Sequence, residues 1–99
     1  MQYVITAHDG TDPGAAARRQ AARPAHLDNI SPMVAGRNIL LGGAILDDAG
    51  AMIGSVCIVD FPTRAALDHW LATDPYVTGG VWTSIDVKPF RVAVVVPAV

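Results

Sequence analysis

Residues 51–61, AMIGSVCIVDF, decide the fold of this 99-residue chain. The segment is rich in Val and Ile and follows the turn sequence DDAG at 47–50, so it is predicted to be a long strand. A strand with one face in water alternates apolar and polar residues, whereas this segment is apolar at both alternating sets of positions. We therefore expect helices to cover one face of the strand and a partner subunit to cover the other.

The flanking segments complete an order of strand, helix, strand, strand, helix and strand. Val-, Ile- and Thr-rich runs predict the strands, and Pro13 and the N-cap residue Thr63 predict the starts of the helices. This is the order of a ferredoxin-like α+β fold. The predicted elements are 2–9, 13–36, 37–46, 51–61, 63–73 and 81–96, with Pro89 splitting the last one into a strand and a short final strand or tail.

The first helical region contains two prolines. Each proline removes a backbone donor, so we expect a break or kink at Pro24 and an irregular end around Pro32. Leu27, Ile30 and Val34 fall at i, i+3 and i+7, which predicts that this side of the helix faces the core.

The composition predicts one domain, residues 1–99, that associates with itself. Hydrophobic residues make up 52% of the chain and charged residues only 16%, against a usual value of about 25% charged. A domain of this size buries roughly 65% of its unfolded surface, so apolar surface is left over. Such surface usually marks an interface, and we expect a homodimer or a higher homo-oligomer.

Charge and local composition exclude several partner classes. The formal net charge of -2 argues against nucleic acid, which requires a basic face. The start MQYVITAHD lacks the features of a signal peptide, and no window approaches the roughly 18–20 apolar residues that span a bilayer. The single cysteine, Cys57, lies in an apolar run and is predicted to be a buried, inert thiol. We expect a cytoplasmic protein without membrane contacts.

Of the three histidines, His26 is the candidate for chemistry. His69 lies on the polar side of the second predicted helix and His8 near the end of the first strand, so both are predicted at the surface. His26 shares a helix side with Arg19 and Arg23, at the border of the apolar stripe. An imidazole there can take and return a proton near neutral pH. The alternative is a histidine with a structural role only, whose hydrogen bonds are satisfied at the edge of the core.

Asp74 precedes Pro75, and a residue before proline is held in an extended conformation. One interpretation is structural: Asp74 ends the second helix or caps a short turn that begins at Pro75. The other interpretation is functional: a rigidly held carboxylate orients an imidazole and stabilises its charge. The sequence leaves both open.

No residue spacing typical of a metal or nucleotide site occurs in the chain. HxH, HExxH and CxxC are absent, and Gly42 and Gly43 lie outside the context of a phosphate loop. These glycines are interpreted as a strand bulge or a close approach of another backbone. Ser55 has no base beside it and no GxSxG context, so it is predicted only as a pocket hydroxyl. We expect neither a metal nor an organic cofactor.

Five motifs together resemble the YciI-like family over nearly the whole chain. RPxHL and DPYxxxGV…VKPF are fairly specific in combination. The resemblance implies a ferredoxin-like fold of the dimeric α/β-barrel type, in which two antiparallel sheets pack face to face. The motifs are YVITAHD at 3–9, RPAHL at 23–27, LLGGAI at 40–45, IGSVCIVDF at 53–61, and DPYVTGGVW…DVKPF at 74–90.

The resemblance also implies a His–Asp pair in a pocket near the subunit interface. His26 is the histidine of RPAHL, and Asp74 of DPY is the acid, with Asp9 as a rival. The two prolines of the His26 helix and the sequence GGVW depart from the family pattern and affect the shape of the pocket. Other motif positions that line the pocket are Arg23, Ser55 and Tyr76.

Together these features predict a small dimeric enzyme that performs an elimination or isomerisation, like a lyase, on a small aromatic or anionic metabolite. His26 would act as base and then acid, Asp74 would fix its tautomer, and Arg23 would meet an anionic group. The alternative is a non-catalytic module that binds a small ligand or serves a pathway enzyme, because ferredoxin-like domains also occur without activity.

Overall fold

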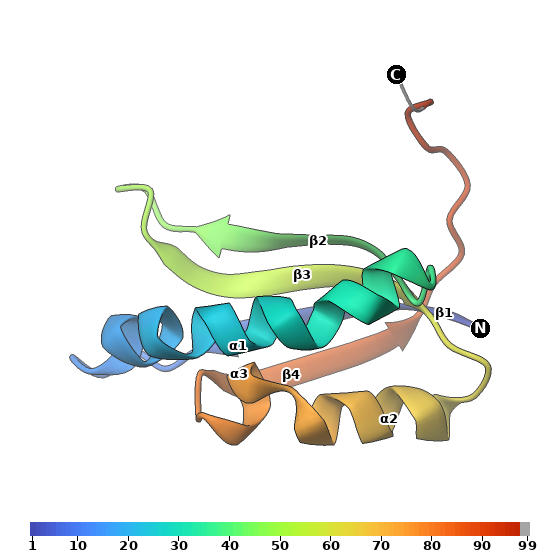
Figure 1. The fold of residues 1–99 in the computed structure, drawn as a ribbon. Coiled ribbons are helices and arrows are strands. Elements are labelled where there is room, and N and C mark those ends of the chain that lie inside the picture. The colour runs from blue at the N-terminus through green and yellow to red at the C-terminus, as the bar shows by residue number, and fades with distance from the viewer. Residues whose placement is uncertain (98–99) are drawn as a thin grey trace.

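A computed structural model describes residues 1–97 of the chain, so the last two residues of the predicted domain, 98–99, lie outside the described part. Helices pack on one face of a four-stranded sheet in the order β2-β3-β1-β4, with every pairing antiparallel (Figure 1). This confirms the ferredoxin-like α+β fold. The elements are β1 (Gln2–Asp9), α1 (Ala15–Ala35), β2 (Ile39–Leu46), β3 (Met52–Asp60), α2 (Arg64–Thr73), α3 (Pro75–Thr78) and β4 (Trp82–Pro89).

Helix α1 continues through Pro24 and Pro32 to Ala35. Of the predicted break or kink at Pro24, the break is therefore wrong, and so is the irregular end predicted around Pro32. A proline removes one intrahelical hydrogen bond, and the other bonds of this 21-residue helix persist. Buried contacts of Arg19 and His26 also hold the middle of α1 against the rest of the fold. The helix ends as predicted near Gly36, whose N–H donates to the carbonyl of Pro32 at 2.9 Å.

The predicted core-facing side of α1 is also only partly right. Ile30 is half-buried, but Leu27 and Val34 are 43% and 51% exposed. The space between α1 and β2 is a cavity. Leu27 and Val34 line it instead of filling the core, whereas Ile30 lines it and also packs against the main core cluster.

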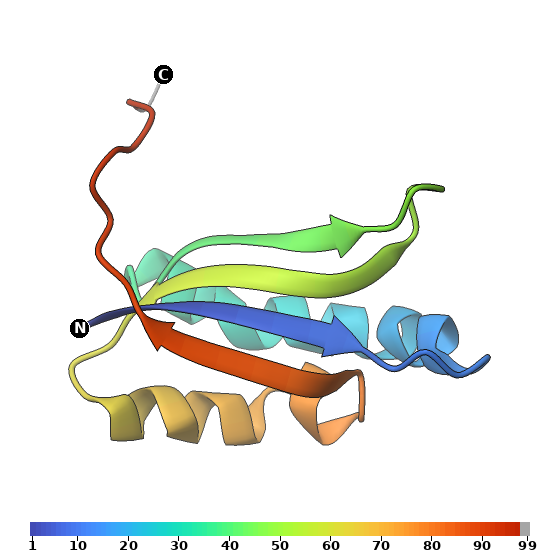
Figure 2. The ribbon, with the colours of Figure 1, turned by 180° about the vertical axis from the view of Figure 1, so that it is seen from behind.

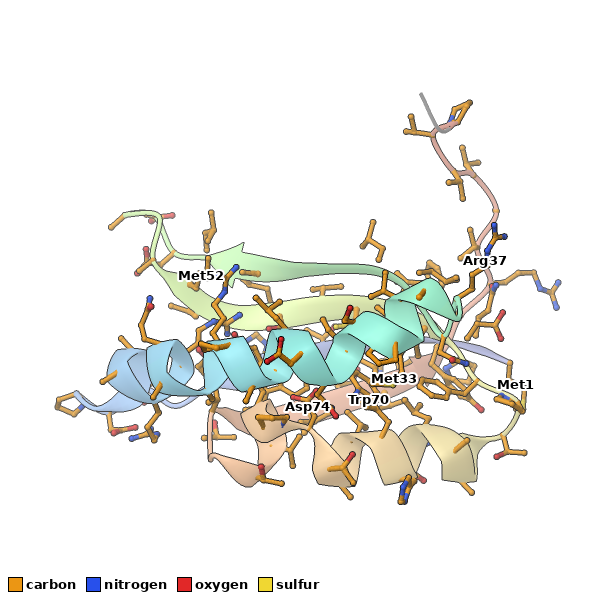
Figure 3. The ribbon with its side chains drawn as sticks, in the orientation of Figure 1. Met1, Met33, Arg37, Met52, Trp70 and Asp74 are labelled. Carbon is orange, nitrogen blue, oxygen red and sulfur yellow. The ribbon has the colours of Figure 1, made fainter. Side chains whose placement is uncertain are left out.

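The main core lies between the sheet and α2. Thr63 caps α2 as predicted, because its hydroxyl accepts from the Ala66 N–H at 3.1 Å. The helix then buries Leu67 and Trp70 in a cluster with Tyr3, Ile5, Ile39, Cys57, Val59 and Phe61. Met33 of α1 and Trp70 of α2 lie in this layer beneath the helices (Figure 3).

The opposite face of the sheet has no helix over it (Figure 2). Cross-strand partners share a face, so Val4 lies beside Ile58 and Thr6 beside Val56. These four residues are half-buried, and Leu41, which pairs with Ile58, is 60% exposed. Within residues 1–97 the chain therefore covers one face of β3 with helices and leaves the other open.

The C-terminal segment follows the prediction that Pro89 ends the strand. β4 stops at Pro89, and residues 90–97 have no regular structure and form a tail. The tail is tied to β1 at its start, where the Val92 N–H donates to Gln2 Oε1 at 2.8 Å. Among the described residues, no helix combines the length and the apolar composition that crossing a bilayer requires.

Candidate active site

His26 and Asp74 meet where the middle of α1 crosses the junction of α2 and α3. The Nδ1 atom of His26 lies 2.7 Å from Oδ1 of Asp74, although the residues are 48 positions apart. The His26 side chain is 11% exposed and that of Asp74 is fully buried. Figure 3 shows Asp74 between α1 and α2.

Asp74 is positioned by its own local sequence. It has the extended conformation expected before Pro75, with φ −69° and ψ 134°, and it ends α2. Its Oδ1 also accepts from the Tyr76 N–H at 2.9 Å, which caps α3. The helix-end interpretation is therefore confirmed, and the same carboxylate contacts His26.

The hydrogen bonds around Asp74 determine which nitrogen of His26 carries the proton. The Asn29 side-chain amide donates to Oδ2 of Asp74 at 3.2 Å, and the Tyr76 N–H donates to Oδ1. An ionised carboxylate only accepts hydrogen bonds, so the Nδ1–H of His26 is the donor in the third contact. In neutral His26 the lone pair is then on Nε2.

Aromatic rings hold the His26 imidazole in place. Its ring stacks on Tyr76 with centroids 3.8 Å apart and an interplanar angle of 8°, and Trp82 approaches edge-on at 5.9 Å. Nε2 has no hydrogen-bond partner within residues 1–97, and His26 lines the cavity beside α1. The arrangement leaves a single oriented nitrogen available to a ligand.

Asp9, the rival acid, binds Arg19 instead of His26. Nη1 of Arg19 lies 2.9 and 3.0 Å from the two carboxylate oxygens of Asp9, and both side chains are buried. The guanidinium also lies over the Tyr76 ring, 4.9 Å from its centroid. Sequence reasoning placed Arg19 on the His26 side of the helix but did not identify it as buried. Two features of the sequence could have identified it: Arg19 lies seven residues before His26, on the same side of the helix, and the preceding strand ends in an acid that can pair with it.

Ser55 and Trp82 join this buried network. Nη2 of Arg19 donates to Ser55 Oγ at 3.0 Å, and Nε1 of Trp82 donates to the same oxygen at 3.2 Å. Trp82 was not among the predicted site residues. It lies at the start of β4, directly after the glycine pair, where the register brings it beside Asp9 of β1.

The cavity between α1 and β2 has a volume of about 410 Å³, within the usual range for small-ligand pockets. One end is polar and the other is apolar. Arg23 is exposed, lines the polar part and forms no ion pair within the described part of the chain, and its role as a ligand-binding residue stays a prediction. The polar lining is Arg19, Arg23, His26, Ser55, Tyr76 and Trp82, and the apolar lining includes Leu27, Ile30, Val34, Ile39, Leu40 and Leu41.

Burial changes the pKa of two groups near the cavity. It raises the pKa of the Tyr76 phenol, although the Arg19 and Arg23 cations act in the opposite direction. Tyr76 therefore stays protonated at neutral pH. Burial, assisted by the charge of Asp74, raises the pKa of the Cys57 thiol to about 11. The predicted burial of the Cys57 thiol is confirmed, and its lack of reactivity stays a prediction.

The remaining histidines lie at the surface, as predicted: both His8 and His69 are exposed. Within residues 1–97 there is no group of three or more His, Cys, Asp or Glu side chains arranged to hold a metal ion.

Comparison with known proteins agrees with the family resemblance. The family model of the YCII-related domain matches residues 1–91. Protein YciI of Escherichia coli O6:H1 is 35% identical over 97 residues, which cover 92% of this chain and 97% of that protein. An uncharacterized protein of Haemophilus influenzae has the same identity and coverage.

Two solved structures share the fold. One is 5-chloro-2-hydroxyhydroquinone dehydrochlorinase (TftG) from Burkholderia phenoliruptrix AC1100 in complex with 2,5-dihydroxybenzoquinone, with a TM-score of 0.80 and 25% identity over 92% of this chain and 94% of that one. The other is a dimeric ferredoxin-like protein of unknown function from Jannaschia sp. CCS1, with a TM-score of 0.51 and 20% identity over 92% of this chain and 98% of that one.

Proposed function

This chain belongs to the YCII-related family, and we propose that it is a lyase-like enzyme in which His26 and Asp74 transfer protons during an elimination on a small oxygenated ring. The observation that carries the proposal is the 2.7 Å contact between Nδ1 of His26 and buried Asp74, which leaves Nε2 free at a cavity. The dehydrochlorinase activity of TftG and its bound dihydroxybenzoquinone support the reaction type and the ligand class.

The geometry supports a base-then-acid role for His26. Asp74 is held by N–H donors from Tyr76 and Asn29, so it keeps one orientation towards the imidazole. Nε2 accepts a proton from a ring hydroxyl, a carbonyl forms, and a ring π pair moves to the carbon that carries the leaving group. His26 returns the proton to that carbon. A second hydroxyl then loses its proton to Nε2 as its own carbonyl forms, and the leaving group departs with its bonding pair. Asp74 stabilises the imidazolium until His26 releases the proton.

The same mechanism covers an isomerisation, in which Nε2 returns the proton to a different atom of the substrate. The two reactions differ in whether a leaving group is present, and the His26–Asp74 contact serves both. The TftG comparison favours elimination.

We also infer a homodimer in which two sheets pack face to face. The open face of the sheet supports this inference, because Val4, Val56 and Ile58 are only half-buried and Leu41 is 60% exposed. Exposed contiguous apolar patches of this kind usually mark interfaces. The described dimeric state of the Jannaschia protein, which shares the fold, is consistent with it.

The test is a turnover assay on chlorinated hydroxyhydroquinones, read out as chloride release. Because a well-placed base contributes about 10²- to 10⁴-fold, His26→Ala should lose that much of kcat. His69→Ala is the matched control, since His69 is exposed on α2 and should leave kcat unchanged.

Turnover by His26→Ala at the wild-type rate would refute the proposed role of His26. Binding of the same rings by the wild-type protein, without release of chloride, would instead favour the non-catalytic binding module.

A further inference from the structure

We propose that Ser55 is a substrate-binding residue whose hydroxyl proton is donated to a carbonyl or oxyanion oxygen on the bound ring. The inference rests on the proposed function and specifies its substrate: a ring that presents one oxygen to Ser55 while a hydroxyl group meets His26.

The hydrogen bonds of Ser55 leave its proton without a partner inside the protein. A hydroxyl group offers two lone pairs and one O–H. Both lone pairs of Ser55 are occupied, by Arg19 Nη2 at 3.0 Å and Trp82 Nε1 at 3.2 Å. Guanidinium and indole N–H groups cannot accept, so neither neighbour takes the Ser55 proton. No other acceptor for it is found within residues 1–97.

The position of Ser55 directs this proton towards the cavity. The residue is only 5% exposed, yet it lines the polar end of the cavity together with His26. Tetrahedral geometry turns the O–H away from the two donors that occupy the lone pairs. A buried hydroxyl that lacks an acceptor is costly, and a ligand oxygen in the cavity would remove that cost.

The network behind Ser55 also strengthens it as a donor. Arg19 is held by both oxygens of Asp9, at 2.9 and 3.0 Å, so its charge stays beside Ser55. A hydroxyl that accepts from a cation is polarised and donates more strongly. The buried Arg19–Asp9 pair therefore acts on the ligand through Ser55, while Arg23 at the polar end of the cavity supplies an unpaired positive charge.

Ser55 and His26 can contact the same small ring in the cavity. Both lie beside Trp82: Ser55 accepts a hydrogen bond of 3.2 Å from it, and the His26 and Trp82 rings form a T-shaped pair with centroids 5.9 Å apart. When Nε2 of His26 removes a proton, negative charge spreads through a conjugated ring to its other oxygens. A donor already in place at one of these oxygens stabilises that charge without reorganisation. The ligand class is therefore a small ring with at least two oxygen substituents, at least one of them a hydroxyl.

The experiment compares the binding of stable probes that differ in ring oxygens: 4-nitrocatechol, 4-nitrophenol and nitrobenzene. Ser55→Ala should weaken 4-nitrocatechol binding by about 10-fold or more, the usual loss for a hydrogen bond to a charged oxygen, and leave nitrobenzene within about twofold. Ser55→Thr keeps the hydroxyl and should bind like wild type. Ser84→Ala, at an exposed serine of β4, is the matched control.

If Ser55 had only a structural role, Ser55→Ala would lower the affinity for all three probes alike, whatever oxygens they carry. Equal 4-nitrocatechol affinity in Ser55→Ala and Ser55→Thr overturns the inference, as does an equal loss for all three probes or no binding of any probe by the wild type. If Ser55→Ala binds normally while His26→Ala loses turnover, the inference fails and the proposed function stands. If the affinity depends on Ser55 but wild type shows no turnover, the proposed function fails and the binding role of Ser55 stands.

Discussion

Replacing Asp74 with Asn separates the two roles that this residue combines. Asn is as good an N-cap as Asp, so α3 keeps its cap and the fold should change little. The carbonyl oxygen of Asn can still accept from the Tyr76 N–H and from His26 Nδ1, while its amide faces Asn29, whose own amide can turn to accept. The substitution therefore removes the negative charge and retains the shape.

The size of the effect follows from the lost charge. Attraction between an imidazolium and a carboxylate about 4 Å apart is worth about 4 kcal/mol at an effective dielectric constant of about 20, which sets an upper limit near 10³-fold in rate. The difference between a charge-assisted and a neutral hydrogen bond is about 1.5 kcal/mol, which sets a lower limit near 10-fold. We expect kcat of Asp74→Asn to fall between these limits, with KM nearly unchanged.

The assay is chloride release with saturating substrate, together with ¹⁵N NMR of the His26 side chain to identify the protonated nitrogen. Wild-type His26 should show a proton on Nδ1 in its neutral form. Asp68→Asn is the control, because Asp68 is an exposed acid of α2 that pairs only with Arg64 at the surface. If Asp74→Asn keeps kcat within about twofold of wild type, the carboxylate serves only as a helix-end residue and the reasoning is refuted.

Three further predictions concern the core and the open sheet face. The Cys57 thiol should resist alkylation in the native state at pH 8 and react rapidly after unfolding in urea. Because its pKa is raised from 9.0 to about 11, the unfolded state loses the thiol proton first, so this thiol should lower the free energy of unfolding by about 2 kcal/mol as pH rises from 9 to 11, and Cys57→Ala should lack this part of the fall. Arg19→Leu leaves Asp9 buried without its partner and should lower the free energy of unfolding by about 3–5 kcal/mol, measured by urea titration, whereas the double variant with Asp9→Leu should recover much of this loss. A double variant no more stable than Arg19→Leu would contradict that account. Val56→Asp places a charge on the open sheet face and should convert the dimer into a monomer in light scattering; an unchanged mass would place the interface elsewhere.

Sequence patterns were most reliable where the cause is local. The alternation of β1, the Thr63 cap of α2 and the end of β4 at Pro89 depend on neighbours within a few residues, and all three appear as predicted. The pattern failed for α1, where Leu27 and Val34 were assigned to the core. Helical periodicity shows which residues share a side, but the packing of α1 on the sheet determines which side is buried.

The sequence by itself determined that Asp74 is extended, ends a helix and precedes a short turn, because the ring of Pro75 restricts the residue before it. It also placed His26 and Arg19 on one side of a helix. Only the tertiary structure decided which acid each of them meets. Asp9 is the last residue of β1, Asp74 directly follows α2, and both matched the pattern. The packing of α1 across the sheet brings Arg19 to Asp9 and His26 to Asp74. Contacts over such separations depend on how whole elements pack, and no local rule of the chain specifies them.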